Sequence, residues 1–176
     1  ANAKKPFYSS TAFLSINKIA KESYSSFIKK MFNDNDRTIT DETIDYILDW
    51  TRQHTYYTQS LCHTIFADGA KDVKMDDVKK ACLEILQQNE MLYLQYRQML
   101  TKTQWNYLIA VAKEGQVTQI TAKAFLAKYN IGTPSTSKRL VNSLYEKELL
   151  SNVVTKDGTS YSVYDVFMSR WLEREF

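Results

Sequence analysis

Glycine is scarce in this chain of 176 residues, and that scarcity limits the possible folds more than any other feature. The four glycines, Gly69, Gly115, Gly132 and Gly158, are spread far apart along the sequence. A loop that binds phosphate needs glycines within about five residues of each other, because bare backbone must approach the anion. A P-loop, a dinucleotide-binding loop and a kinase glycine loop are therefore excluded within these residues. With only two prolines as well, the chain favours long helices over a many-stranded sheet.

Composition and charge are those of a globular protein. Hydrophobic residues make up 44% of the chain, enough for one or two modest cores, and the net charge is +3. The whole positive excess falls in residues 99–176, but it is too small to require a nucleic-acid partner. Cys62 and Cys82 lie in helical patterns without disulfide or metal spacing, so we expect buried thiols in a reducing compartment. No apolar run approaches the roughly 20 residues of a membrane span, and we expect a cytoplasmic protein without a membrane partner.

The first half of the chain is predicted to form a helical bundle. Apolar residues at helical spacing predict a helix over 24–32, Thr40 is a suitable N-cap for a second, and a third covers about 55–67 before Gly69. A fourth helix is predicted over about 76–99. Its expected apolar seam is Val78, Cys82, Ile85, Leu92, Tyr96 and Met99. A short strand is also predicted at 13–16.

The second half has a different order of elements. Helices are predicted over about 103–113, 121–128 and 135–148, with Pro134 at the start of the last and Ser135 or Thr136 as its cap. Two strands, 149–155 and 159–164, meet at Asp157-Gly158, which is a strong hairpin signal, and a helix over 166–174 follows. This order is typical of a winged helix-turn-helix. We therefore predict a mainly α fold: a linker at 1–19, a helical bundle at 20–99, and a winged helix with a small β-hairpin wing at 100–176.

The third helix of a winged helix is the one that can read DNA, and its outer face is polar here. Arginine can bond guanine in a bidentate manner, asparagine can do the same with adenine, and serine, threonine and lysine can hold phosphates. Acidic residues at Glu146, Glu148 and Asp157 would oppose a DNA backbone, so an ordinary solvated face is the alternative. The candidate residues are Ser135, Thr136, Lys138, Arg139, Asn142 and Ser143, with Lys156 on the wing.

No catalytic or metal site is predicted. His54 and His63 are on opposite sides of an ideal helix, so they cannot share a metal ion on one face. The pattern Gly-x-Ser-x-Gly of a hydrolase nucleophile does not occur. We therefore expect no enzyme activity and no cofactor for this chain.

Several segments together resemble the C-terminal part of prokaryotic AAA-type ATPases of the archaeal ATPase family, close to the signal-transducing ATPases. The resemblance covers almost the whole chain, and its most specific part is the winged-helix ending. The similar segments are Pro6-Phe7-Tyr8, Phe13-Leu14-Ser15-Ile16, Tyr24-Ser25-Ser26-Phe27-Ile28 with Phe32, His54-Thr55-Tyr56-Tyr57-Thr58-Gln59-Ser60-Leu61-Cys62, Ser137-Lys138-Arg139-Leu140 with Leu144 and Leu149, and Tyr161-Ser162-Val163-Tyr164-Asp165-Val166-Phe167 with Arg170-Trp171-Leu172.

The resemblance implies that the bundle is the lid of an ATPase and that His54 faces the nucleotide of the core. Gln53 and Thr55 stand where the family has glycine and proline, so of the Gly-His-Pro that opens the lid motif only the histidine matches. The resemblance also implies ATP and Mg²⁺ as ligands of a full-length protein whose Walker motifs lie before residue 1.

These observations lead to one expected function and two alternatives. The expected function is a non-catalytic regulatory region that couples the nucleotide state of an upstream ATPase core to a winged helix, which contacts DNA or a protein. The first alternative is an independent winged-helix transcription regulator that binds DNA. The second is a protein–protein interaction module.

Overall fold

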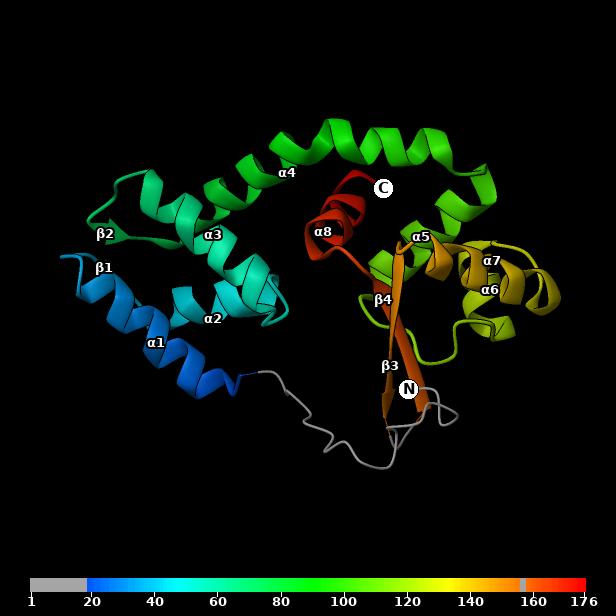
Figure 1. Cartoon of the computed structure of the whole chain (residues 1–176), viewed down its shortest axis with the longest axis horizontal. Helices are drawn as coiled ribbons and strands as arrows, with labels where there is room; N and C mark the ends of the chain where they lie inside the picture. Colours follow the sequence, from blue (N-terminus) through cyan, green and yellow to red (C-terminus); the bar gives the residue numbers. More distant parts are fainter. Residues whose placement is uncertain (1–18, 156–157) are drawn as a thin grey trace, which may run out of the picture.

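A single long helix, α4 (Met75–Met99), connects two groups of elements in the computed structural model, which describes residues 19–155 and 158–176 (Figure 1). The first group contains α1 (Lys21–Asn33), α2 (Asp41–Trp50) and α3 (Thr55–Ala67). The second contains α5 (Lys102–Glu114), α6 (Lys123–Tyr129), α7 (Pro134–Glu146) and the hairpin of β3 (Leu150–Thr155) and β4 (Gly158–Val163). The last helix, α8 (Val166–Glu175), returns to lie beside α4 between the two groups. The mainly helical fold with one small hairpin is confirmed. The predicted strand at 13–16 lies outside the described residues.

Local signals set the ends of the bundle helices much as expected. Thr40 is the N-cap of α2, and its Oγ1 accepts the Thr43 N–H at 3.2 Å. Phe27 and Met31 belong to the predicted apolar stripe of α1, yet they are 55% and 45% exposed, because they line an open groove between α1 and α3. The side chains that form the bundle core are Tyr24, Ile28 and Phe32 of α1, Ile44, Ile47 and Leu48 of α2, and Tyr57, Leu61 and Ile65 of α3.

Two strands that the sequence pattern did not reveal also belong to the bundle. β1 (Thr38–Ile39) pairs in parallel with β2 (Asp72–Val73), and Ile39 and Val73 are both buried. Strands of two residues are too short to show the alternation that identifies a strand in a sequence. This pair fixes the α1–α2 connection against the α3–α4 connection.

The apolar seam of α4 differs from the predicted one in its second half. The first three predicted members are buried, but Leu92 and Met99 are 41% and 74% exposed. Tyr93, which was not predicted, is 1% exposed and its ring lies 5.4 Å from that of Trp171. α4 packs on α2, α3 and α8, and in its second half it is Tyr93 that meets Trp171 of α8, so the buried face there differs from the predicted seam.

Residues 100–176 fold as a winged helix. β3 and β4 are antiparallel, with Leu150 opposite Val163 and Thr155 opposite Gly158. The predicted cap of α7 was wrong: Thr133 is the N-cap and Pro134 occupies the first helical position. Proline fits that position because the missing N–H would have no partner there, so the cap falls just before it.

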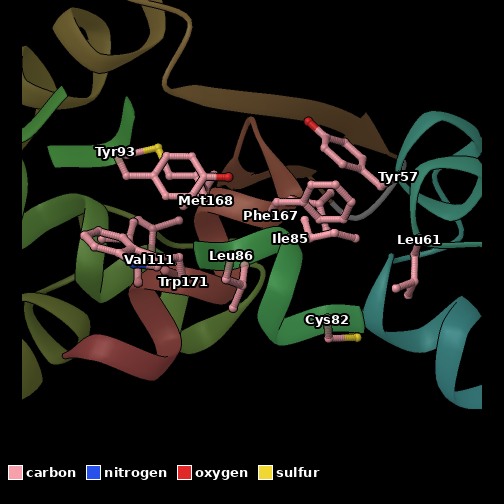
Figure 2. Packing of buried hydrophobic residues seen from close by; sticks show 14 of the residues in the cluster. Tyr57, Leu61, Cys82, Ile85, Leu86, Tyr93, Val111, Phe167, Met168 and Trp171 are labelled. Carbon is pink, nitrogen blue, oxygen red and sulfur yellow. The ribbon is translucent and has the colours of Figure 1, made fainter. Parts of the chain in front are cut away.

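α8 joins the winged helix to the bundle through aromatic contacts (Figure 2). The ring of Phe167 lies 4.7 Å from that of Tyr57 of α3, and Trp171 contacts Tyr93 of α4. Trp105 of α5 lies 6.2 Å from Trp171 on the winged-helix side. One continuous hydrophobic core therefore runs through both halves. α4 ends near residue 100, but the core does not divide there, so the predicted domain boundary stays a prediction.

Candidate functional site

The outward face of α7 presents several of the predicted DNA-binding residues to solvent. Ser135, Lys138, Arg139 and Asn142 are all exposed, and no carboxylate of the described residues forms an ion pair with Lys138 or Arg139. Both cations are therefore available to an anionic partner. Lys156, predicted on the wing, lies outside the described residues.

Two other predicted members of this face also form hydrogen bonds within the protein. Oγ1 of Thr136 accepts the Thr133 N–H at 3.1 Å and donates to the Thr133 carbonyl at 2.9 Å, which completes the cap of α7. Ser143 is half-buried and accepts a hydrogen bond from Nε2 of Gln104 in α5 at 3.0 Å. Ser143 therefore faces inward and holds α7 against α5, so its assignment to the outer face was wrong.

A groove of about 650 Å³ runs beside this face, between α7, the hairpin and the segment that connects α5 to α6. Lys138 and Asn142 line it from α7, while Thr159 and Tyr161 line it from β4. Gln119 of the connecting segment closes the third side. The groove thus brings one cation, two amides and hydroxyl groups together, a set that can bond phosphates and base edges.

A second polar site, which no sequence pattern predicted, lies between the α2–α3 turn and α8. Nη2 of Arg52 donates to Oγ of Ser169 at 2.8 Å and to Oε1 of Glu173 at 3.0 Å. Ser169 is fully buried and itself donates to Oε1 of Glu173 at 3.1 Å. We call the group of Arg52, Ser169, Arg170 and Glu173 the turn clamp.

Arg170 completes the turn clamp from α8. Its Nε donates to the Trp50 carbonyl at 2.9 Å, and its Nη2 donates to the Asp49 carbonyl at 3.0 Å. Its Nη1 donates to Oε2 of Glu173 at 2.7 Å. Arg170 thus donates to two carbonyl groups at the C-terminal end of α2, where the regular helical hydrogen bonds end, and the Asp49 carbonyl also accepts the Arg52 N–H at 3.2 Å.

In the turn clamp, the two cations Arg52 and Arg170 both contact the carboxylate of Glu173. Burial lowers the pKa of Arg52, the positive charge of Arg170 lowers it further, and Glu173 opposes both effects. The backbone of the clamped turn is also unusual, because Arg52 and the next residue, Gln53, have φ values of 53° and 55°. Two consecutive left-handed residues other than glycine are costly, so the surrounding contacts hold this turn in place.

The clamp could be found only in part from the sequence. Arg170 and Glu173 are three residues apart on a predicted helix, a spacing at which side chains meet. Arg52 lies 121 positions before Glu173, and no local pattern connects them.

His54 lies immediately after the clamped turn. It is the N-cap of α3, its side chain is exposed, and its N–H donates to the Thr51 carbonyl at 3.1 Å. Its ring meets the ring of Tyr57 edge-on, with centroids 4.8 Å apart. His54 is therefore accessible from outside and is two residues from Arg52.

Other kinds of site receive little support. In the described ranges, no three His, Cys, Asp or Glu side chains come together as metal ligands. None of the described helices combines the length and apolar character of a membrane span. Cys82 is buried, Cys62 is half-buried, and neither forms a disulfide. Burial raises the pKa of the Cys82 thiol to about 12, which makes it a poor nucleophile at neutral pH.

Comparison with known proteins supports the winged helix, and it also finds a similar fold in an ATPase. Residues 91–174 match a family model described as a probable winged helix domain. The solved structure of the Walker-type ATPase PABY2304 of Pyrococcus abyssi is similar to 88% of this chain, with a TM-score of 0.62 and 12% sequence identity. The chain spans 42% of that ATPase, and at this identity the likeness is one of fold. Comparison with curated proteins finds no match.

Proposed function

We propose that this chain is the regulatory, non-catalytic part of an ATPase, and that it couples the nucleotide state of an ATP-binding core to the winged helix. The observation that carries this proposal is the turn clamp, which ties the bundle turn before His54 directly to α8 of the winged helix. The fold likeness to a Walker-type ATPase, of which this chain spans less than half, supports the presence of such a core.

The proposed mechanism follows from the stiffness of the clamped turn. His54 would face the nucleotide or the core, as the resemblance to the AAA-type lid implies. A displacement of His54 would move Arg52, because only one residue with a constrained backbone separates them. Arg52 would then pull on Ser169 and Glu173 of α8, and α8 packs against α5 of the winged helix.

The experiment uses this chain together with the residues that precede it in its gene. We expect a Gly-Lys-Ser or Gly-Lys-Thr loop upstream, and ATP hydrolysis by the longer protein but not by residues 1–176 alone. Glu173→Gln should change the hydrolysis rate at least about threefold, whereas Glu175→Gln on the exposed end of α8 should leave it unchanged. A gene that lacks the loop, or equal rates for the two variants, would reject the proposal.

A second function, duplex DNA binding by α7, is favoured by the two exposed cations beside the groove. Fluorescence anisotropy across a salt series tests it. A double Lys138→Ala, Arg139→Ala variant should weaken binding and reduce the slope of log K against log salt by about 0.9 for each lost phosphate contact.

The matched control removes two exposed lysines outside the winged helix, Lys30 and Lys79, so the net charge of both double variants is the same. Control binding should stay near that of the wild type. If the two double variants behave alike, the affinity comes from net charge and α7 is not the DNA-binding element. If the wild type binds no duplex, the winged helix has another partner.

A further inference from the structure

A small hollow of about 210 Å³ lies where the bundle, α4 and the winged helix meet. Three tyrosines line it from three different segments: Tyr57 from α3, Tyr96 from α4 and Tyr164 from the connection between β4 and α8. Ligand pockets for drug-sized molecules usually measure about 300–1,000 Å³, so this hollow is large enough only for a small head group.

The polar lining of the hollow has a net negative charge. Asp165 and Glu148 contribute two carboxylates, and Lys147 contributes one cation. Oδ1 of Asp165 accepts the Met168 N–H at 3.0 Å, and no second bond to this carboxylate is found among the described residues. An anionic ligand would be repelled by this lining, and a neutral ligand would lose hydration without an attractive charge in return. A cation would be attracted.

The negative charge of Asp165 affects the pKa of Tyr57 and of Tyr93. Burial is the main reason that the pKa of Tyr57 lies above its usual range, and the negative charge of Asp165 raises it further. The same two causes raise the pKa of Tyr93, which is buried behind the hollow on α4. Tyr57 therefore stays neutral at physiological pH and keeps an aromatic ring that can attract a cation.

The geometry points to a binding site for a quaternary or methylated ammonium group in this hollow. Aromatic side chains with a nearby carboxylate recognise such groups, because a methylated ammonium loses little hydration and binds the negative faces of the rings. Neither the winged helix nor the likeness to an ATPase assigns this site. A ligand there would touch the bundle, α4 and α8 together.

Isothermal titration calorimetry on the whole chain tests the site with choline and with a trimethyllysine peptide. The neutral carbon analogue of choline, 3,3-dimethyl-1-butanol, has the same shape without the charge. We expect an ammonium ligand to bind with a dissociation constant in the millimolar range or below, and the neutral analogue to bind at least about tenfold more weakly. Binding of choline, with or without the peptide, would indicate that the ammonium group alone is sufficient, as for a free small molecule. Binding of the peptide alone would indicate a modified protein, and each result supports the site.

Variants separate the aromatic contribution from general effects. Tyr164 is 59% exposed, so Tyr164→Ala should preserve the fold while it weakens ammonium binding about tenfold, and Tyr164→Phe should keep it. Tyr145→Ala is the matched control, since Tyr145 is 50% exposed and does not line the hollow. Equal binding of choline and its neutral analogue, equal loss in the two alanine variants, or no binding of either ammonium ligand would overturn the proposal.

Discussion

Arg52 and Glu173, which are 121 positions apart in the sequence, form an ion pair with 3.0 Å between Nη2 and Oε1. Their side chains are only 21% and 25% exposed, and Arg170 bonds the other oxygen of the same carboxylate. We expect Glu173→Gln to lower the free energy of unfolding by about 1–3 kcal/mol, because two largely covered arginines lose the charge between them. Urea denaturation measures this change.

Glu175→Gln is the control for this prediction. Its partner, Arg174, is exposed and 3.6 Å away, and surface pairs of this kind contribute about 0–1 kcal/mol. A double-mutant cycle between Arg52→Gln and Glu173→Gln should give a coupling energy of at least about 1 kcal/mol. A coupling near zero would mean that the pair does not hold the turn.

Gly132→Ala should destabilise the connection between α6 and α7 in the winged helix. Gly132 has a φ of 99°, and an added Cβ would lie 3.1 Å from Oγ1 of Thr136, which caps α7. Strain and crowding together should cost about 1–3 kcal/mol in thermal or urea unfolding. Gly69→Ala separates the two causes, because its φ is 85° but its added Cβ would meet nothing within 4 Å. A larger loss at Gly69 would contradict the expected crowding.

Thr101→Ala should lower the free energy of unfolding by about 1 kcal/mol, because α5 loses its N-cap. Oγ1 of Thr101 accepts the Gln104 N–H at 3.2 Å, and Oε1 of Gln104 accepts the Thr101 N–H at 3.0 Å, so the substitution leaves a helix N–H without its acceptor. Thr103→Ala changes an exposed threonine of the same helix and should cost much less. Hydrogen exchange at the first turn of α5 would show whether the loss is local.

Tyr107→Phe should change how stability depends on pH at alkaline values. Tyr107 is fully buried and donates to the Ile120 carbonyl, and burial raises its pKa from 10.0 to about 12. The folded state thus holds the phenol proton more tightly than the unfolded state, so this contribution is complete below pH 10 and disappears as the pH rises towards 12.

The Tyr107→Phe variant has no phenol to titrate, so its unfolding free energy should fall less steeply between pH 10 and pH 12. At neutral pH it should be about 1–2 kcal/mol less stable, because the Ile120 carbonyl loses its donor. Urea unfolding at a series of pH values measures both effects. Parallel curves for the variant and the wild type would contradict the assignment.

The sequence predicted the helices and the hairpin well because their signals are local. Thr40 as a cap and the periodic spacing of apolar residues each depend on a few neighbouring positions. The predicted turn at Asp157 lies outside the described residues. The exposed cations Lys138 and Arg139 on α7 were predicted for the same reason: once the helix is known, its outer face follows from the period.

The remaining features depend on contacts between distant segments. The buried face of α4 differs from the predicted seam because Tyr93 packs against Trp171 of α8, and no pattern within α4 indicates that helix. Ser143 turned inward because Gln104 of α5 lies beside it. The turn clamp was missed because Arg52 finds its partners only after the chain has returned through α8.

The return of α8 to the bundle has a consequence for the order of folding. During synthesis, α1, α2 and α3 leave the ribosome long before Glu173 does, so the left-handed turn at Arg52 and Gln53 at first lacks the contacts that hold it. Contacts at such long sequence separation form slowly, because a large loop must close before they stabilise anything. The nascent bundle therefore keeps an unsecured turn until the last helix has been made, and only the completed chain has the rigid connection between its two halves.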